Sequence, residues 1–353
     1  MRKFVVIFVC CILFLCGCAD SAHESVSDIS GAQSNNVSLH TAELFAMDTY
    51  MTLKAYCADD NPLNSAQAII ESLEKELSVT SSDSDISRLN NAQGEEIVLN
   101  YDCAELIKNA LDLCERTSGA LDITIYPILR EWGFTIGDYK IPAPENIRSL
   151  LTKVNYSSVA AAENSVQLPS GYMIDLGAVA KGYTSDKIIS MFKESGITSA
   201  IISLGGNVHA LGSKPDGSAW KIALTDPNLP QTYIGNLEIV DKAVITSGSY
   251  ERYFTGDDGT RYCHIISPFD GYPVNNGIAS VTVIGDSGVL CDALSTALFV
   301  MGKEAAVEHW RKHCDFEMII ITDGGKVFVT EGIHNSFSLS RVYEKSKLEV
   351  IYR

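Results

Sequence analysis

The sequence predicts an α+β fold with mixed, largely antiparallel sheets and flanking helices. Many short strand-like runs fill the second half of the chain, and Gly, Asp, Asn and Pro residues separate them. Only a few segments have the longer apolar period of a helix. Hairpins joined by tight turns, with few long helices, are typical of the α+β class.

The chain opens with a segment typical of an export signal. Two basic residues precede an uninterrupted apolar run from Phe4 to Leu15, which is long enough for a signal peptide and too short to span a bilayer. The run ends in Leu15-Cys16-Gly17-Cys18, which resembles a bacterial lipobox. We expect residues 1–17 to be a lipoprotein signal peptide and Cys18 to be lipidated, with a plain secretory signal as the alternative.

The next segment has almost no apolar residues. Residues 18–38 are rich in Ser, Asn, Asp and Ala and bury too little surface to order themselves, which predicts a flexible tether. It would hold a folded body, residues 39–353, on the extracytoplasmic side, anchored by lipid to the bacterial cell membrane. The chain has 27 basic and 44 acidic side chains and a net charge of −17, which argues against nucleic acid as a partner.

Six cysteines belong to the body, and none form a C-x-x-C pair. The sequence therefore supports neither a zinc site nor a thioredoxin-like motif. Each cysteine lies in an apolar pattern, which favours small buried thiols, and an oxidised pair is the alternative in an exported protein. The six are Cys57, Cys103, Cys114, Cys263, Cys291 and Cys314.

Local patterns predict the elements of the first half of the body. Asn61 and Pro62 supply an N-cap and a first-turn proline to an apolar stripe of helical period. Gly119 and Gly196 each follow a further helical stripe and end it. In order, we expect a strand at 49–57, helices at 61–77, 102–117 and 142–151, a two-stranded hairpin at 165–174 around Pro169-Ser170-Gly171, and a helix at 180–194.

The second half of the body reads as short strands between turns. Asp257-Asp258-Gly259 is typical of a hairpin turn. We expect strands at 201–204, 208–211, 220–224, 235–240, 244–246, 250–254, 262–266 and 280–284.

The last of these strands leads into a helix that carries Asp292 and Thr296 four residues apart. This spacing places a carboxylate and a hydroxyl on one helix face. Both are hard oxygen ligands, and magnesium prefers one or two such oxygens completed by water and substrate phosphate. The pair is thus a candidate half of a magnesium–phosphate site, and capping of the helix start is the alternative.

Two junctions between elements are candidate ligand sites. The segment from Gly119 to Pro127 places Asp122 beside apolar and aromatic residues that could hold a flat ring, unless Asp122 simply caps the next turn. The segment from Asp175 to Tyr183 joins a strand to a helix through two glycines. A helix start attracts anions, so Lys181 could reach a phosphate there. The alternative is a tight turn with a solvated lysine, and the Walker spacing is absent.

Two polar turns and one histidine complete the candidate set. Leu204-Gly205-Gly206-Asn207 and the turn from Thr246 to Arg252 could line a phosphate or adenosine pocket, although tight turns explain both equally well. His264 follows apolar strand residues and directly precedes a loop. It is either a satisfied core group or a catalyst.

Taken together and in order, these segments resemble the ApbE family, the FAD:protein FMN transferases, which are often exported lipoproteins. The resemblance spans about residues 45–335 and implies an ApbE-like, T-fold-like architecture for the body. The matching stretches are Met47-Asp48-Thr49, Ser84 to Asn90, Gly119 to Pro127, Asp175 to Gly182, Leu204-Gly205-Gly206, Thr246 to Arg252, His264 to Gly271 and Asp292 to Thr296.

The resemblance also implies roles for individual residues. Those expected to contact FAD are Met47, Thr80, Ala120, Leu121, Asp122, Asp175, Lys181 and Ile265. Those expected to bind Mg²⁺ are Asp292 and Thr296 by side chain and Ala178 by its main-chain carbonyl, which agrees with the helix-face argument. His264, with Asp292, is the expected catalytic group.

Three positions depart from the family pattern. Asp48 replaces the usual glycine after Met47, and Thr80 stands where relatives often carry an aromatic residue near the flavin. Ser267 replaces the aspartate common after the His-Ile-Ile run. The first two bear on the packing of the flavin ring more than on the metal.

The implied reaction takes FAD and a protein Thr or Ser hydroxyl to an FMN–protein ester and AMP, with Mg²⁺ as cofactor. The implied acceptor is an exported or membrane flavoprotein with a short Thr- or Ser-containing motif. One alternative is a magnesium-dependent FAD pyrophosphatase, in which water replaces the hydroxyl. Another is a flavin-binding lipoprotein without turnover.

Overall fold

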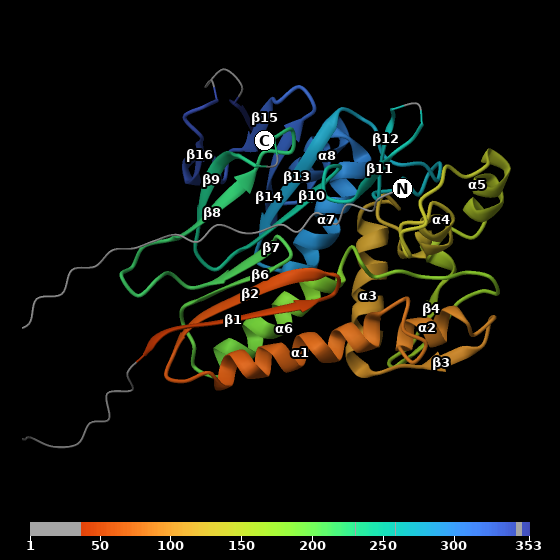
Figure 1. Cartoon of the computed structure of the whole chain (residues 1–353), viewed down its shortest axis with the longest axis horizontal. Coiled ribbons are helices and arrows are strands. Elements are labelled where there is room, and N and C mark those ends of the chain that lie inside the picture. Colours follow the sequence, from red (N-terminus) through yellow and green to blue (C-terminus); the bar gives the residue numbers. More distant parts are fainter. Residues whose placement is uncertain (1–36, 230, 258, 344–347) are drawn as a thin grey trace, which may run out of the picture. The chain divides into compact units, whose positions relative to one another are not determined.

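The computed structural model describes residues 37–229, 231–257, 259–343 and 348–353. A nine-stranded sheet runs through it in the order β1-β2-β6-β7-β10-β13-β14-β15-β17 (Figure 1). Neighbouring strands pair antiparallel except β15 and β17, which pair parallel. These strands are β1 (Ser38–Ala46), β2 (Thr49–Cys57), β6 (Ala200–Leu204), β7 (Asn207–Leu211), β10 (Ala243–Gly248), β13 (Ile278–Gly285), β14 (Phe316–Thr322), β15 (Val327–Thr330) and β17 (Leu348–Ile351).

Helices cover one face of this sheet. Apolar side chains of α1 and α6 pack on β1, β2 and β6, and those of α7 and α8 pack on β10, β13 and β14 (Figure 1). The helices are α1 (Asn61–Leu77), α2 (Asp85–Asn90), α3 (Tyr101–Arg116), α4 (Tyr126–Glu131), α5 (Pro144–Leu151), α6 (Ala180–Glu194), α7 (Gly288–Met301) and α8 (Lys303–Lys312), with 3₁₀ turns at Ile123–Ile125, Tyr156–Ser158 and His334–Ser336.

The other face, over β7, β10, β13, β14 and β15, is covered by a three-stranded sheet of β8 (Trp220–Thr225), β9 (Tyr233–Ile239) and β16 (Phe337–Leu339). Strand β14 shows why the central strands read as continuous apolar runs. Met318 and Ile320 face the helices, whereas Ile319 and Ile321 face the small sheet, because successive side chains of a strand point to opposite faces. The mixed sheets with their helices confirm the predicted α+β class.

Two small units complete the fold. A short sheet joins β3 (Glu96–Val98), β4 (Ala160–Ala161) and β5 (Ser165–Gln167), and a hairpin joins β11 (Tyr253–Thr255) to β12 (Arg261–Cys263). Trp132, at the end of α4, ties this hairpin to the helices. Its ring lies 5.4 Å from that of Tyr262 and 6.3 Å from that of Phe254, and its Nε1 donates to the Gly271 carbonyl over 2.9 Å.

Most predicted elements are present, and the exceptions have physical causes. The predicted hairpin at 165–174 is wrong in its second half, because β5 pairs with β3 and β4 instead. The main chain of Ile174 is held by the side chain of Asn90, whose Nδ2 donates to its carbonyl over 2.9 Å and whose Oδ1 accepts from its N–H over 2.7 Å. Helix α1 begins at Asn61, so Asp60 and not Asn61 is its N-cap residue.

The edge strand β1 is an element that local pattern did not predict. Its nine residues pair in register with β2 from Ser38↔Cys57 to Ala46↔Thr49, so the last residue of the predicted tether already belongs to the sheet. The predicted signal peptide, Cys18 and the rest of the tether lie outside the described residues. No helix in the described part of the chain is long and apolar enough to cross a membrane.

The burial of the body cysteines follows the expectation in five cases out of six. Cys57, Cys103, Cys114, Cys263 and Cys291 are buried, and Cys314 is exposed. Cys314 follows α8 at the surface, where its sulfur contacts the guanidinium of Arg353. All six are unpaired in the described structure.

Candidate active site

The starts of helices α6 and α7 meet at two glycines. A Cβ on Gly182 would lie 2.3 Å from the carbonyl oxygen of Gly288, and a Cβ on Gly288 would lie 2.5 Å from the carbonyl oxygen of Gly182. Any side chain at either position would therefore push the helices apart. The contact brings the first turn of α6, with Lys181, next to the face of α7 that carries Asp292.

Asp292 is buried, with 5 % of its surface exposed, and its Oδ2 accepts a hydrogen bond from the main-chain N–H of Gly182 over 2.8 Å. Burial raises the pKa of Asp292, and the nearby charge of Lys181 opposes that rise. The side-chain amide of Asn207 also lowers the pKa of this carboxyl. A buried carboxylate next to a lysine is suited to hold a cation or to face a phosphate that shares the lysine.

The Ala178 carbonyl is left free by this arrangement. In a regular helix the N–H of Gly182 would donate to the carbonyl four residues earlier, which is that of Ala178. It donates to Asp292 instead, and no residue in the described part of the chain donates to Ala178. The free carbonyl and the Asp292 carboxylate are thus linked through Gly182, which follows Ala178 by four residues and donates to Asp292.

The hydroxyl of Thr296 lies one turn further along α7. Its Oγ1 is 3.2 Å from Oγ of Ser247 on β10, and Ser247 Oγ is 2.8 Å from Oγ of Ser295. Carboxylate, hydroxyl and main-chain carbonyl oxygens are all hard ligands, so the residues present fit Mg²⁺. The described residues contain no group of three or more His, Cys, Asp or Glu side chains able to hold a metal.

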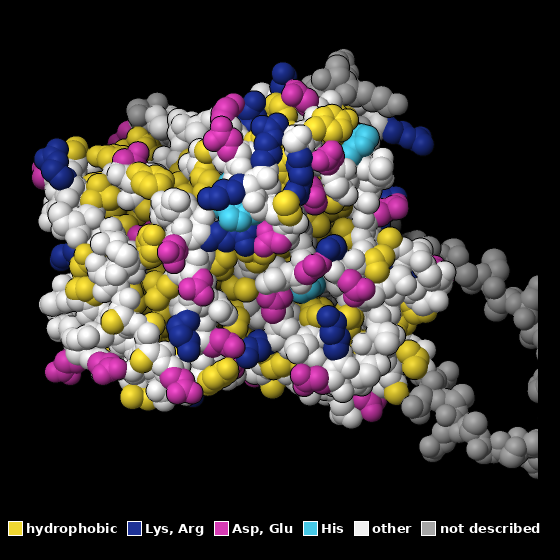
Figure 2. Space-filling model, turned by 180° about the vertical axis from the view of Figure 1, so that it is seen from behind, with side chains coloured by type: hydrophobic (Ala, Val, Ile, Leu, Met, Phe, Trp, Pro, Cys, Tyr) yellow, Lys and Arg dark blue, Asp and Glu magenta, His cyan; other side chains and the backbone are white. Residues whose placement is uncertain are grey.

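Lys181 acts on groups from three separate segments. Its charge opposes the burial-driven rise in pKa of both Asp175 and Asp292, and it helps to depress the pKa of His264. The three groups lie in the loop before α6, in α7 and directly after β12, so the charge of this lysine links segments far apart in the sequence. Figure 2 shows Lys and Arg side chains gathered around a histidine on one face of the molecule.

Asp175 and Asp122 belong to neighbouring loops. The N–H of Asp175 donates to the carbonyl of Ile123 over 2.9 Å, and its Oδ1 accepts from the N–H of Gly177 over 2.7 Å. Asp122 is buried, which raises its pKa. Its carboxylate accepts hydrogen bonds from the N–H and hydroxyl of Thr124, over 2.8 and 2.6 Å, and from the N–H of Tyr156 over 3.0 Å.

The alternative proposed for Asp122, a turn cap, thus describes its carboxylate in this structure, and contact with FAD stays a prediction. Four other residues expected to contact FAD differ in exposure. Ala120, Leu121 and Ile265 are buried, whereas Thr80 is exposed. The segment before Thr80 reaches the same loops, because the hydroxyl of Tyr126 donates to the carbonyl of Val79 over 3.3 Å.

Met47 and Asp48 form the two-residue turn between β1 and β2, with φ angles of 48° and 59°. Two positive φ values mark the hairpin turn in which glycine is most at ease and aspartate is tolerated. The family glycine that Asp48 replaces thus has a local explanation. The turn is tied to α1, because the N–H of Met47 donates to Glu74 Oε1 over 2.6 Å.

His264 lies at the open end of the β11–β12 hairpin. Its main-chain N–H donates to the carbonyl oxygen of Arg252 over 3.0 Å, and its ring Nδ1 lies 3.1 Å from the same oxygen. Burial, with the charges of Arg252 and Lys181, lowers the pKa of His264 to about 3. Because a carbonyl oxygen only accepts, Nδ1 carries the proton of the neutral ring and Nε2 keeps a lone pair.

Ser267, which replaces the family aspartate, keeps the turn after His264. Its Oγ accepts from the N–H of Phe269 over 3.3 Å, the bond that an aspartate would also make. Two surface hollows of about 500 and 530 Å³ lie elsewhere, lined for example by Lys214 and by Arg311. None of the predicted site residues lines either hollow.

The structure adds residues that the sequence argument missed. Arg252 orients His264 through its carbonyl, Asn207 lies beside Asp292, and Asp186 links α6 to α7. Arg252 and Asn207 lie within motifs that were recognised, so those motifs were the available signal. Nothing in the local pattern around Asp186 distinguishes it from a solvated helix residue.

Two facing helix starts, a buried carboxylate, a lysine and a neutral histidine are groups suited to a phosphate-bearing ligand. A model of the ApbE family matches residues 47–320, and the chain belongs to that family. By family the chain is a flavin transferase.

Three similar proteins agree with this assignment. The FAD:protein FMN transferase of Vibrio cholerae is 34 % identical over 242 residues, 67 % of this chain and 72 % of that protein. The FAD:protein FMN transferase of Klebsiella pneumoniae is 31 % identical over 310 residues, 86 % of this chain and 95 % of that protein. The crystal structure of the ApbE protein of Thermotoga maritima superposes with a TM-score of 0.79 at 30 % identity, covering 85 % of this chain and 99 % of that one.

Proposed function

We propose that this enzyme transfers FMN from FAD to a Thr or Ser hydroxyl of an exported or membrane flavoprotein, with Mg²⁺ as cofactor and AMP as the second product. The observation that carries the proposal is the contact between the starts of α6 and α7. There the buried Asp292 carboxylate accepts from Gly182 N–H and is influenced by the charge of Lys181, and the Ala178 carbonyl has no donor in the described part of the chain. The names of the relatives support the flavin substrate.

The reaction exchanges one phosphorus–oxygen bond for another. The acceptor oxygen bonds to the phosphorus on the FMN side of the pyrophosphate, the bond from that phosphorus to the bridging oxygen breaks, and AMP leaves with the bridging oxygen. Such a transfer depends on positioning and on neutralising charge more than on covalent chemistry. Lys181 is placed to stabilise the charge that develops on the departing phosphate.

The metal requirement is assigned to three groups of this chain. Asp292, Thr296 and the carbonyl of Ala178 would hold Mg²⁺, which when bound supplies charge neutralisation to the pyrophosphate. Burial of Asp292 excludes water from the carboxylate, and the Gly182 hydrogen bond fixes its orientation. A single carboxylate matches the preference of Mg²⁺ for few protein ligands.

His264 is the proposed base that accepts the proton of the acceptor hydroxyl. Its ring is neutral, its Nδ1 proton is engaged by the Arg252 carbonyl, and its Nε2 lone pair is available. That lone pair accepts the proton as the acceptor oxygen bonds to phosphorus. General-base assistance contributes about 10²–10⁴-fold and is greatest when the pKa of the base lies near the working pH, so the low pKa of His264 places its contribution at the lower end of that range.

The decisive experiment incubates the purified enzyme with FAD, Mg²⁺ and a candidate acceptor flavoprotein. We expect AMP in solution and an acceptor whose Thr or Ser carries FMN, read by intact-protein and peptide mass spectrometry. Release of FMN and AMP with an unmodified acceptor would indicate the pyrophosphatase instead. FAD that stays intact with every acceptor and metal would indicate a binding protein.

We also propose that the mature enzyme is held at the membrane by a lipid on Cys18. The lipobox-like Leu15-Cys16-Gly17-Cys18 and the polar segment after it support this. Mass spectrometry of the N-terminal peptide from the membrane fraction tests it. An unmodified N-terminus, or cleavage anywhere other than before Cys18, would contradict it.

A further inference from the structure

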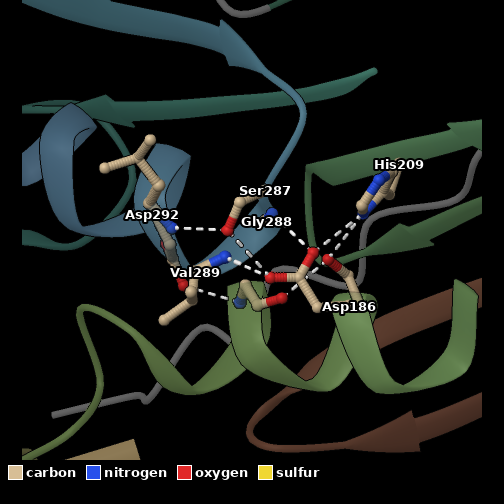
Figure 3. Close-up of polar contacts among 9 residues, drawn as sticks. Asp186, His209, Ser287, Gly288, Val289 and Asp292 are labelled. Carbon is tan, nitrogen blue, oxygen red and sulfur yellow. Dashed lines mark hydrogen bonds and ion pairs between the residues drawn. The ribbon is translucent and has the colours of Figure 1, made fainter. Parts of the chain in front are cut away.

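Asp186 of α6 binds the start of α7. Its Oδ1 accepts from the N–H of Gly288 over 2.6 Å, and its Oδ2 accepts from the N–H of Val289 over 3.0 Å and from the hydroxyl of Ser287 over 3.1 Å (Figure 3). The first N–H groups of a helix have no partner within it, and the positive end of the helix dipole favours an anion there. Asp186 therefore caps α7 from another helix.

Asp292 makes the reverse connection. It lies on α7 and accepts from the N–H of Gly182, one turn before Asp186 on α6. Each helix thus gives a carboxylate to the main chain of the other, at the two glycines that are in close contact, Gly182 and Gly288. Two hydrogen-bonded points and a close backbone contact together fix both the separation and the register of the helices.

A buried histidine lies beside Asp186. His209 of β7 has 4 % of its surface exposed, and its Nδ1 lies 3.6 Å from Asp186 Oδ1 and 3.0 Å from Ser185 Oγ. Ser185 Oγ donates to the carbonyl of Gly182 over 2.7 Å, so it accepts from His209 Nδ1–H. The Asp186 carboxylate is thus approached from β7 as well as from α7.

The register of the two helices decides whether the metal ligands meet. The Ala178 carbonyl precedes α6, and Asp292 and Thr296 lie on α7. Building on the proposed function, we propose that Asp186 is a positioning residue, which caps α7 from α6 and so places Asp292 and Thr296 opposite the Ala178 carbonyl. It is not one of the residues proposed to bind the metal. Partners of this kind, one shell away from the ligands, typically alter metal affinity by about 10–100-fold when removed.

The test measures metal binding without turnover. Mn²⁺ alone is titrated into the full-length protein and followed by electron paramagnetic resonance, for the wild type, Asp186→Ala and Asp186→Asn. We expect the Mn²⁺ dissociation constant to rise about ten-fold or more in Asp186→Ala, and by a smaller factor in Asp186→Asn, which keeps one acceptor oxygen. Asp186→Asn also serves if the alanine variant does not fold.

Asp226→Asn is the matched control. Asp226 is more buried than Asp186, so its loss should cost at least as much stability. Its carboxylate likewise accepts from a main-chain N–H, that of Asn228 over 2.8 Å, but it lies after β8. We expect Asp226→Asn to lower the melting temperature and to leave Mn²⁺ binding unchanged. This result would show that weaker Mn²⁺ binding in the Asp186 variants does not follow from lower stability alone. If both Asp186 variants bind Mn²⁺ with wild-type affinity, the positioning role of Asp186 is wrong, whereas the proposed metal site is unaffected. A wild type that binds no Mn²⁺ would overturn the metal site of the proposed function, and the inference with it.

Discussion

His264 donates two hydrogen bonds to one atom, the carbonyl oxygen of Arg252, through its main-chain N–H over 3.0 Å and through ring Nδ1 over 3.1 Å. The main-chain bond continues the backbone hydrogen bonding of the β11–β12 hairpin. The ring bond to the same oxygen favours the tautomer of His264 that carries its proton on Nδ1. The hairpin therefore both positions the imidazole and decides which nitrogen is free for chemistry.

Replacing His264 by asparagine separates the catalytic interpretation from a purely structural one. The Nδ2 of asparagine can donate to the Arg252 carbonyl as Nδ1 does, but no base remains at the position of Nε2. We expect FAD affinity and melting temperature to stay near wild type, and single-turnover transfer to slow by about 10²-fold or more. A lower melting temperature with an unchanged rate would show that His264 only packs the hairpin.

The titration of His264 gives a second, independent prediction. The ordinary pKa of histidine is about 6.5, and burial with two nearby cations lowers that of His264 to about 3. An imidazole is neutral at pH values above its pKa. The neutral base form of His264 should therefore persist throughout the range from pH 5 to 8. We expect its imidazole NMR signals, assigned by their loss in His264→Asn, not to move over this range and to report a proton on Nδ1. A midpoint near 6.5 would refute the burial argument.

The metal assignment predicts a graded loss along α7. Asp292→Asn keeps an oxygen that accepts from Gly182 N–H but removes the anionic ligand, so we expect Mg²⁺-dependent AMP release from FAD to be abolished with little loss of stability. Thr296→Ala removes a neutral hydroxyl and should weaken Mg²⁺ dependence less. The measurement is AMP release against Mg²⁺ concentration, with circular dichroism as the control for folding. Parental turnover in Asp292→Asn would show that the metal binds elsewhere.

The sequence predicts correctly those helices and strands whose apolar period and end signals lie within one short segment of the chain. Helix α6 has the predicted bounds, Ala180–Glu194, because its apolar stripe and the glycine after it are both local. The order of the sheet could not be predicted in the same way. Placing β6 beside β2 joins segments about 150 residues apart, through pairs such as Met51↔Leu204, and such pairings have no signal in short windows.

The site shows the same division. Asp292 and Thr296 could be paired from their spacing on one helix, and the structure keeps them on one face of α7. The cap that Asp186 provides could not be inferred, because its partners are main-chain N–H groups about 100 residues away. A main-chain donor has no sequence identity, so contacts that depend on it appear only in three dimensions.

Asn90 offers a test of the one substantial error in the sequence-based prediction, the missing second strand of the 165–174 hairpin. Its buried amide satisfies both main-chain groups of Ile174, over 2.9 and 2.7 Å, as a neighbouring strand would have done. Asn90→Ala leaves a buried N–H and a buried carbonyl without a partner, and we expect the free energy of unfolding to fall by about 2–4 kcal/mol. Chemical denaturation measures it.

Asn146→Ala is the control for that experiment. Asn146 donates a single exposed hydrogen bond to Glu131 over 3.0 Å, and we expect its loss to change the free energy of unfolding by no more than about 0.5 kcal/mol. Because Ile174 directly precedes Asp175, Asn90→Ala should also weaken FAD binding in the enzyme that remains folded. Equal stabilities of the two variants would mean that water replaces the Asn90 amide, and that the course of the chain into Asp175 is set by the glycine turn rather than by this side chain.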